Sequence, residues 1–518
     1  MPMSGEMAAE AHEDWGPFGE PIFESPSARA LSRVGVVDVG SNSVRLVVFD
    51  GAARSPAYFF NEKLMCGLGA GLSETGRLNP KGRERALEAL RRFALLAEGM
   101  GASPMTVIAT AAMREAKDGP DFVKQVKKET GLRMWVIDGK EEARLTAQGV
   151  LLGWPGADGI VCDIGGSSME LAQVRDGGVG KRETSPLGPL KLAGVQGGNK
   201  AVSKVIRSEV NKLVKAVGNH RRLYLVGGSW RAIARLDMER RGYPLLVLHD
   251  YHMTPKAIRE TIKWIGQNDL EELRTRTGTS ATRMALVPMA CEVLETLIDR
   301  LKPEDIFVSS YGVREGLLYE QMSDEQRRRD PLIEACQFAE ASSSRIPGFG
   351  RRLYDFVRPV FADAVPEQRR LARAACLLHD TAWRAHPDYR HEVCFDNATR
   401  ANLGGLDHQG RVFLGLALLH RYKNNREGTR FEAMFSLLDK DHLRMAETLG
   451  KAMRFGAMFT MKNPEQMATL HPRPDEGVLE LQLSGDALGL FGEVAEARFQ
   501  SLARAMDLRT MVTVTKAG

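Results

Sequence analysis

Cysteine is scarce in this chain, and the few cysteines present are scattered. The 518 residues contain six of them and no Cys-x-x-Cys pair, at Cys66, Cys162, Cys291, Cys336, Cys376 and Cys394. This spacing argues against a zinc knuckle or a disulfide framework and is typical of a reducing compartment. The sequence also shows no secretory leader and no run of 18 apolar residues. We therefore expect a soluble, cytoplasmic protein without a membrane partner.

Aromatic residues are also few, at 7% of the chain, and the net charge is only mildly basic at +5. This charge suits a polyanionic ligand, although many enzymes without such a ligand share it. We expect no nucleic-acid partner. The apolar content of 43% is ordinary for a globular protein, and the length predicts three or four domains.

The first informative stretch covers residues 34–50 and reads VGVVDVGSNSVRLVVFD. Two valine-rich runs flank the polar segment Gly40-Ser41-Asn42-Ser43, a pattern that predicts two buried strands joined by a tight turn. Backbone N–H groups in such a turn can bind an anion, and Asp38 beside it could hold a divalent cation. An ordinary hairpin with a solvated Asp38 explains this stretch equally well.

A second stretch, residues 160–174, repeats the pattern as IVCDIGGSSMELAQV. Asp163-Ile164-Gly165 matches Asp38-Val39-Gly40, and Ser168 matches Ser43. The two stretches lie about one domain length apart. Two matching hairpins at this separation indicate a duplicated unit that binds its ligand between the two halves.

Four segments together carry a resemblance to a known family. DVGSNS and DIGGSSME, with ATAAMREA at 109–116 and EEARLTAQGV at 141–150, resemble the exopolyphosphatase / guanosine pentaphosphate phosphatase (Ppx/GppA) family. That family belongs to the actin–hexokinase–heat-shock chaperone fold group. The resemblance covers roughly residues 33–320 and continues weakly beyond. One position departs from it: the family usually has a third glycine where this chain has Ser167, which could narrow the approach of phosphate.

The resemblance implies an α/β fold with two tandem ribonuclease-H-like (actin-like) domains, and the expected element order β-β-β-α-β-α-β agrees with it. We divide the chain into a disordered extension (1–29), actin-like domain I (30–145), actin-like domain II (146–322), a mostly helical HD-like domain (323–455) and a small α+β C-terminal unit (456–518). The last unit is predicted from the alternating residues 479–483, LELQL, and a helical pattern after them.

The HD-like label rests on CLLHD at residues 376–380, whose His379-Asp380 pair resembles the metal helix of HD hydrolases. That metal site needs an earlier histidine, and none occurs between Arg327 and His379. A metal site requires its full set of ligands. We therefore expect a structural, metal-free domain rather than a second hydrolase.

Removing a terminal phosphoryl group requires a site that holds the polyanion, neutralises charge and orients water. The two turns supply backbone donors and hydroxyls, so the predicted phosphate-binding residues are Gly40, Ser41, Asn42, Ser43, Gly165, Gly166, Ser167 and Ser168. Asp38, Asp163 and Glu170 are the predicted metal ligands, although Glu170 could instead face away from the site. Hard oxygen ligands of this kind suit Mg²⁺, with a monovalent cation such as K⁺ as an option.

Glu142 and Arg114 are the predicted catalytic residues. Glu142 begins the helix that leads from domain I to domain II, and the resemblance points to this second glutamate of EEAR as the base for water. From the sequence alone, the Glu141-Glu142 pair could simply favour the dipole of the helix N-terminus. Arg114 follows a strand and a small-residue turn, where a guanidinium can bind phosphoryl oxygens, as the family pattern also implies.

The function expected from these residues is hydrolysis of terminal phosphate from inorganic polyphosphate by an exopolyphosphatase, expected as a homodimer. The main alternative is a guanosine pentaphosphate (pppGpp) phosphohydrolase, for which Trp230 could offer a platform for the base. A kinase of the same fold group would need a nucleotide pocket, to which Gly227-Gly228 could contribute. A non-catalytic polyphosphate-binding regulator is the other alternative. Basic clusters in the helical domain, each of which could be a plain solvated surface, favour polyphosphate if they form a track toward the cleft.

Overall fold

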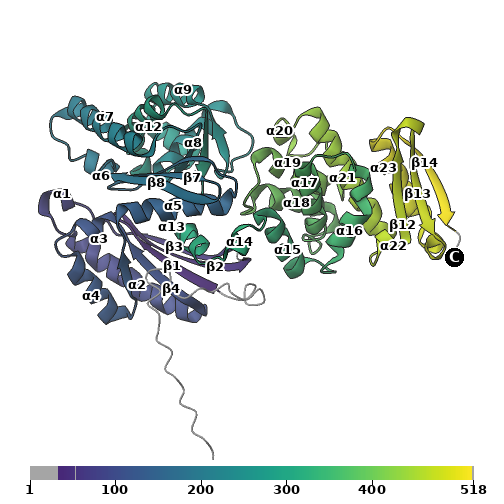
Figure 1. Ribbon diagram of the computed structural model, residues 1–518, viewed down its shortest axis with the longest axis horizontal. Helices are drawn as coiled ribbons and strands as arrows, with labels where there is room; N and C mark the ends of the chain where they lie inside the picture. Colours follow the sequence, from purple (N-terminus) through teal and green to yellow (C-terminus); the bar gives the residue numbers. More distant parts are fainter. Residues whose placement is uncertain (1–32, 53, 516–518) are drawn as a thin grey trace, which may run out of the picture.

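The computed structural model describes residues 33–52 and 54–515, so the predicted extension at 1–29 lies outside the described residues. Figure 1 shows two α/β lobes stacked on each other, a helical domain beside them and a small sheet at the far end. The two lobes are the predicted actin-like domains I and II.

Domain I contains a five-stranded sheet with strand order β3-β2-β1-β4-β5. The first three strands are antiparallel, and β4 and β5 continue the sheet in parallel with β1. Valine and leucine side chains on both faces of β1 and β2 are buried. Helices α2 and α4 cover one face, and the helices that contain Leu145 and Leu317 cover the other. The elements are β1 (Arg33–Val39), β2 (Ser43–Ala52), β3 (Ser55–Met65), α1 (Leu72–Thr75), α2 (Pro80–Gly99), β4 (Ala102–Ala109), α3 (Ala111–Glu115), α4 (Gly119–Thr130) and β5 (Met134–Val136).

Domain II repeats this order as β8-β7-β6-β9-β11, with β10 added antiparallel at the edge. Its first two strands form a hairpin in which Asp163 lies opposite Glu170. The duplication inferred from the two hairpins is therefore a duplication of the whole sheet. The elements are β6 (Gly159–Ile164), β7 (Met169–Arg175), β8 (Gly178–Ser185), α6 (Pro189–Leu192), α7 (Gly198–Val217), β9 (Arg222–Val226), α8 (Gly228–Arg241), β10 (Tyr251–Met253), α9 (Pro255–Gly266), α10 (Leu270–Thr277), α11 (Ala281–Met284), α12 (Val287–Leu301) and β11 (Asp305–Ser309).

Two helices join the lobes: α5 (Gly139–Gly153) and α13 (Val313–Glu320). They pack closely because glycines remove side chains at the crossing: a Cβ on Gly149 would lie 2.2 Å from the Gly312 oxygen, and one on Gly316 would lie 1.8 Å from the Leu145 oxygen. Helix α5 runs through the predicted boundary at 145/146, so the two domains divide along a helix rather than at a loop.

The chain beyond domain II is helical up to Phe459 and contains one large buried core. It contacts the lobes directly, because Arg54 of domain I donates a hydrogen bond to the Arg329 carbonyl (3.2 Å). Its elements are α14 (Asp324–Arg327), α15 (Pro331–Ser343), α16 (Phe349–Val357), α17 (Pro366–Leu378), α18 (Arg390–Arg400), α19 (His408–His420), α20 (Glu432–Phe435) and α21 (Lys440–Phe459), with short 3-10 turns η2 (Arg358–Phe361) and η3 (Pro387–Tyr389).

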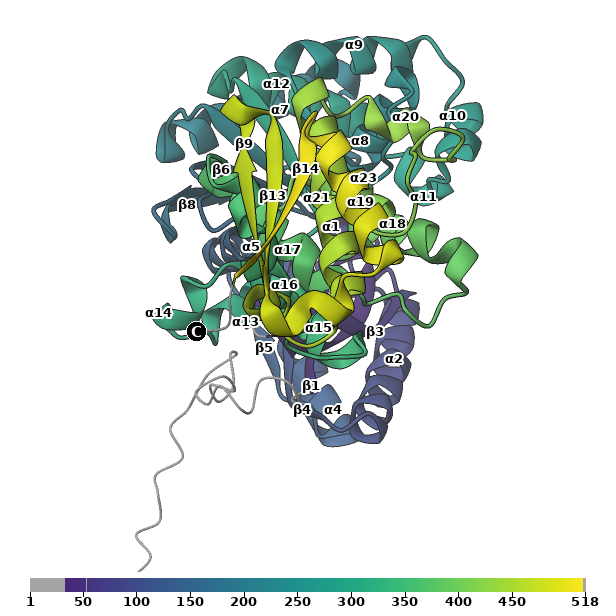
Figure 2. The same cartoon turned by 90° about the vertical axis from the view of Figure 1, so that its right-hand side faces the viewer.

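The C-terminal unit is a three-stranded sheet of order β12-β13-β14 covered by helix α23, as Figure 2 shows from its end. The leucines of β13 are buried and alternate with partly exposed or paired polar residues, which is the periodicity that predicted the strand. The elements are α22 (Pro464–Met467), β12 (Ala468–Arg473), β13 (Val478–Ser484), α23 (Glu493–Ala505) and β14 (Arg509–Thr515), with 3-10 turns η4 (Pro474–Glu476) and η5 (Gly485–Leu490). None of the described helices combines the length and apolarity needed to cross a bilayer.

Candidate functional site

The two predicted turns face each other across a cavity of about 420 Å³ between domains I and II. Each turn closes with the same hydrogen bond, from Gly40 N–H to the Ser43 oxygen (3.0 Å) and from Gly165 N–H to the Ser168 oxygen (2.9 Å). Seven of the eight predicted phosphate-binding residues line this cavity, namely Gly40, Ser41, Asn42, Ser43, Gly165, Gly166 and Ser168. Ser167 is buried but does not line it.

The four predicted carboxylates lie on the floor of this cleft or just behind it. Asp38 and Asp163 occupy equivalent places near the ends of β1 and β6 and line the cavity, as does Glu142 in the first turn of α5. Thr146 donates a hydrogen bond to Asp163 Oδ2 (2.9 Å), and Thr184 donates one to Glu170 Oε1 (2.9 Å). Glu170 is only 1% exposed, so it does not face outward to solvent.

Burial and mutual repulsion raise the pKa of these carboxyl groups. Desolvation is the largest cause in each case, and it raises the pKa of Asp163 to about 6 and that of Glu170 to about 8. The pKa of Glu142 lies well above its usual value because of burial, followed by the charges of Glu170 and Asp163. The pKa of Asp38 is also raised by burial, against the opposing effect of Arg314. A cation placed among these groups would favour their ionised forms.

The donor set fits a hard divalent cation in part. Glu142 Oε2 and Glu170 Oε2 are buried and have no hydrogen-bond partner in the described structure. Oxygen atoms of this kind are the ligands that Mg²⁺ prefers, and leaving them unpartnered is costly. However, no three acidic, histidine or cysteine side chains among the described residues approach closely enough to hold a metal by themselves. An ion here would complete its coordination with water and phosphate oxygens.

Arg114 lies beside the predicted base rather than on the cavity wall. Its NH1 group donates a hydrogen bond to the Ile137 carbonyl (2.7 Å) and is 3.9 Å from Glu142 Oε2. The Ile137 contact fixes the guanidinium at the C-terminal end of α3, next to the N-terminus of α5. The structure therefore brings the two predicted catalytic residues together.

Sequence analysis missed most of the basic side chains that surround the cleft. The cavity is lined by five basic residues, namely Arg45, Lys63, Arg231, Arg283 and Arg314. Arg231 follows the Gly227-Gly228 turn and Arg314 follows Gly312, so a basic residue after each turn was a usable signal. Arg283 and Lys63 belong to other elements, and no local pattern marks them.

These basic groups are poorly compensated. Arg314 lies 3.9 Å from Asp38 and 3.9 Å from Glu315, whereas Arg45, Lys63, Arg231 and Arg283 form no ion pair within residues 33–52 and 54–515. Burial and the neighbouring arginines lower the pKa of Arg231 to about 10 and also lower that of Lys63. Uncompensated positive charge inside a cleft is expected where the natural occupant is a polyanion.

The Gly227-Gly228 turn follows β9 and lines this cleft, where it lies against the end of β6. Gly227 has φ of 118°, and a Cβ on it would lie 2.7 Å from the Ile164 oxygen and 3.1 Å from Asp163 Oδ1. A side chain at this position would therefore displace the second phosphate turn. By contrast, Trp230 is fully buried in the core of domain II, so the predicted base platform is wrong. No aromatic residue lines the cavity as the structure describes it.

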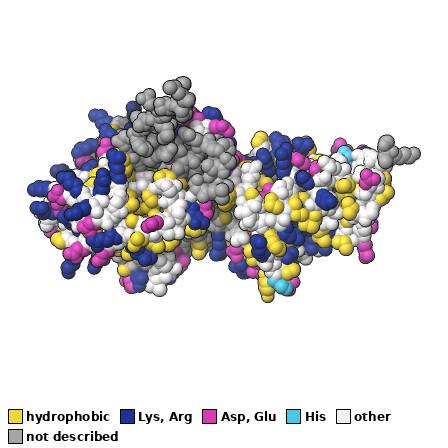
Figure 3. All heavy atoms as spheres, turned by 90° about the horizontal axis from the view of Figure 1, so that it is seen from below, with side chains coloured by type: hydrophobic (Ala, Val, Ile, Leu, Met, Phe, Trp, Pro, Cys, Tyr) yellow, Lys and Arg dark blue, Asp and Glu magenta, His cyan; other side chains and the backbone are white. Residues whose placement is uncertain are grey.

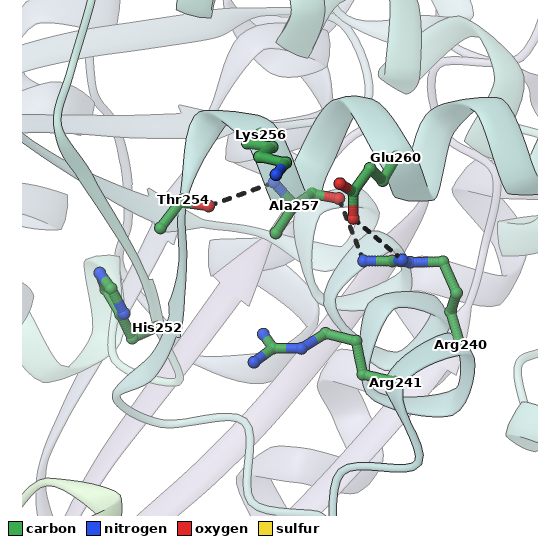
Figure 4. A pocket seen from close by; sticks show the side chains of 7 residues that line it. All are labelled: Arg240, Arg241, His252, Thr254, Lys256, Ala257 and Glu260. Atoms are coloured by element: carbon green, nitrogen blue, oxygen red, sulfur yellow. Dashed lines mark hydrogen bonds and ion pairs between the residues drawn. The ribbon is translucent and has the colours of Figure 1, made fainter.

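A second basic pocket lies on the outer side of domain II and differs in its charge balance (Figure 4). Its arginines are already paired: Arg240 lies 3.2 Å from Glu260 and 3.1 Å from the buried Asp237, and Arg241 lies 3.4 Å from Asp237. The pocket is lined by Arg240, Arg241, His252, Thr254, Lys256, Ala257 and Glu260. It therefore differs from the main cleft in that neighbouring carboxylates compensate both of its arginines.

Comparisons with known proteins agree with this geometry. Residues 47–325 match the model of the Ppx/GppA phosphatase family, and residues 332–512 match the model described as exopolyphosphatase, C-terminal. Exopolyphosphatase 1 of Mycobacterium tuberculosis is 25% identical over 309 residues, covering 57% of this chain and 89% of that protein. Retrograde regulation protein 2 of Saccharomyces cerevisiae is 24% identical over 439 residues, covering 76% and 73%.

Solved structures extend the similarity to the fold. The crystal structure of an exopolyphosphatase from Cytophaga hutchinsonii superimposes with a TM-score of 0.51 at 23% identity. The superposition covers 56% of this chain and 97% of that one, which is the extent of the two lobes. At this identity, the match bears on the fold alone.

Proposed function

Because the chain belongs to the Ppx/GppA phosphatase family, and is therefore a phosphatase, we propose that it is an exopolyphosphatase which removes terminal phosphate from inorganic polyphosphate. The observation that carries this proposal is the charge pattern of the cleft. Buried carboxylates lie at its floor, and its wall carries four basic side chains that form no ion pair with any residue the structure describes.

The polyanion is bound by the two turns and the basic wall. The backbone N–H groups of both turns and the hydroxyls of Ser41, Ser43 and Ser168 bind the terminal phosphoryl group. The phosphates that follow it are neutralised by Arg45, Lys63, Arg231 and Arg283. Asp38, Asp163 and Glu170 would supply part of the coordination of Mg²⁺, and water and phosphate oxygens would complete it. When bound, the ion would supply charge stabilisation for the transferring group.

Glu142 acts as the base for the attacking water. Burial and the neighbouring carboxylates raise the pKa of Glu142, which makes it a stronger base than an ordinary glutamate. Arg114, whose NH1 group is 3.9 Å from Glu142 Oε2, orients this carboxylate from behind the cavity wall. Water held in line with the terminal anhydride loses its proton to Glu142 as the bond to the next phosphate breaks.

The lining of the cleft favours polyphosphate over guanosine pentaphosphate. A guanine base needs a stacking surface and hydrogen-bond partners, and a site without them does not discriminate for it. The cavity lacks aromatic side chains among its described lining, and Trp230 is buried elsewhere. Polyphosphate requires only positive charge, which this wall supplies.

The expected basic track through the helical domain receives little support. Several of its arginines are paired locally, for example Arg329 with Glu325 (2.9 Å), Arg370 with Asp330 (2.6 Å) and Arg430 with Glu392 (3.0 Å). Figure 3 shows Lys and Arg side chains interspersed with Asp and Glu on the face seen there. The proposal therefore places the recognition of the polyphosphate chain in the cleft rather than along a surface path.

For the helical domain, the HD-like fold stays a proposal, and it concerns the environment of the His379-Asp380 pair. Both carboxylate oxygens of Asp380 accept hydrogen bonds from Arg345, at 2.6 and 2.8 Å. Burial lowers the pKa of His379 to about 4, and its Nδ1 lies 2.8 Å from the Cys376 carbonyl oxygen. A guanidinium thus neutralises the carboxylate that a metal ion would otherwise neutralise.

The test is phosphate release from long-chain polyphosphate with Mg²⁺ and no acceptor, beside guanosine pentaphosphate on the same preparation and at one salt concentration. We expect measurable phosphate release from both substrates, with a higher kcat/KM for polyphosphate. A higher value for the nucleotide would reverse the substrate assignment. Turnover only with an added acceptor would indicate a kinase, and binding without turnover would indicate a regulator.

A further inference from the structure

Ser167 is the one predicted phosphate-binding residue that does not face the cavity. Its side chain is 6% exposed, and its hydroxyl donates a hydrogen bond of 2.9 Å to Oγ of Ser41 in the opposite turn. This bond connects domain I to domain II at the point where the two phosphate turns meet. A role for Ser167 other than direct phosphate binding is therefore needed.

Each serine is held firmly by its own domain. The backbone carbonyl oxygen of Ser41 accepts a hydrogen bond from Gly69 N–H (2.7 Å). On the other side, the backbone of Ser167 packs against Gly188, where a Cβ would lie 2.2 Å from the Ser167 carbonyl carbon. Leu190 N–H also donates a hydrogen bond to the Gly166 oxygen (2.9 Å), which anchors the second turn.

An ion pair between other segments also joins domain I to domain II. Lys191, next to Leu190 in α6, lies 2.7 Å from Glu115 at the end of α3. Glu115 directly follows Arg114, which lies beside Glu142. The Ser41–Ser167 bond and the Lys191–Glu115 ion pair are therefore two separate contacts between the domains, and the second involves the helix that carries Arg114.

The direction of the Ser167 bond affects what Ser41 can do. A hydroxyl donates one hydrogen bond, and Ser41 accepts from Ser167. Its own proton therefore remains available for the cavity, which Ser41 lines. Hydrogen bonds in such a chain also strengthen one another.

We propose that Ser167 is a positioning residue that acts through Ser41: it holds the two phosphate turns together and directs the Ser41 hydroxyl as a donor to the terminal phosphoryl group. This inference rests on the proposed function, since it concerns the same cleft. Ser167 touches neither the phosphate nor the attacking water. Its contribution appears where charge develops on the phosphoryl oxygens, which is a contribution to kcat.

The test is a double-mutant cycle of Ser167→Ala and Ser41→Ala, with kcat and KM measured separately for phosphate release. We expect Ser167→Ala to lower kcat about three- to tenfold, the usual weight of one hydrogen bond, and to change KM less than about twofold. In the Ser41→Ala background, Ser167→Ala should have almost no further effect. Ser185→Ala, which removes another buried hydroxyl of domain II, is the matched control and should leave kcat unchanged.

Unchanged kcat in Ser167→Ala would overturn the proposal, and so would losses that simply multiply in the double variant, because Ser167 would then act independently. An S41C/S167C variant tests the contact without relying on activity. The six native cysteines are buried, so mild oxidation should remove the two introduced thiols and neither single variant should react in this way. If the native chain released no phosphate, the proposed function would fail, while the disulfide would still decide whether the turns meet.

Discussion

Glu142→Gln should separate catalysis from stability. The amide keeps the size of the side chain and removes both its negative charge and its basicity. Loss of a general base costs roughly 10²–10⁴-fold in rate, so we expect kcat to fall by that factor. The stability of the fold should increase, because the substitution removes a buried charge from the cleft.

Glu142 is buried beside Glu170 and Asp163, and the charges of these two groups raise its pKa. Its Oε2 atom also lacks a hydrogen-bond partner among the described residues. Removing one of several mutually repelling buried charges relieves both desolvation and repulsion. At pH 8 without divalent cation, we expect the variant to unfold about 2–4 °C above the native protein, which is about 1 kcal/mol for a domain of this size.

The assay pairs initial rates of phosphate release from polyphosphate with thermal unfolding of the same samples in a chelating buffer. Lys140→Gln in the same helical turn is the matched control, because its side chain is exposed and pairs with Glu183 rather than with the buried acids. A variant that keeps near-normal turnover would refute the assignment of the base. A variant that is both inactive and clearly destabilised would refute the picture of uncompensated carboxylates.

Three further outcomes are expected from the same geometry. Asp163→Asn should reduce the rate and weaken its dependence on Mg²⁺, measured as the Mg²⁺ concentration for half-maximal activity, whereas full activity of the native chain in chelator would exclude a metal site. In metal-free buffer, the free energy of unfolding should decrease as the pH rises from about 4 to about 8, because Asp163 (pKa about 6) and Glu170 (pKa about 8) bind protons more tightly in the folded state than in the unfolded state. Added Mg²⁺ should restore the stability near pH 8. A free energy of unfolding that does not change with pH in denaturant titrations would contradict these pKa values. Arg231→Ala should raise KM for polyphosphate at least about fivefold and make this KM less dependent on salt concentration. The control is Arg259→Ala, which should change neither quantity because the exposed Arg259 side chain pairs with Asp299. Equal effects of the two variants would argue against a specific basic wall.

The sequence was sufficient for features that are built from neighbouring residues. The strand-turn-strand pattern around Asp38 and Asp163 predicted both hairpins, because apolar runs, small turn residues and short hydrogen bonds are all local. Its repetition also predicted the duplicated lobes, and the position of Glu142 at a helix start placed it near the cleft.

Only the tertiary structure decided which distant residues share the cleft and which way they face. Arg231, Arg283 and Lys63 come from three separate elements and converge on one cavity, and no periodicity records that convergence. Trp230 and Ser167 lie next to glycine turns and suggested ligand contacts, yet Trp230 enters the core and Ser167 turns to Ser41 of the other domain. Side-chain direction at such positions depends on the packing of two domains against each other, and that packing energy is summed over contacts far apart in the chain.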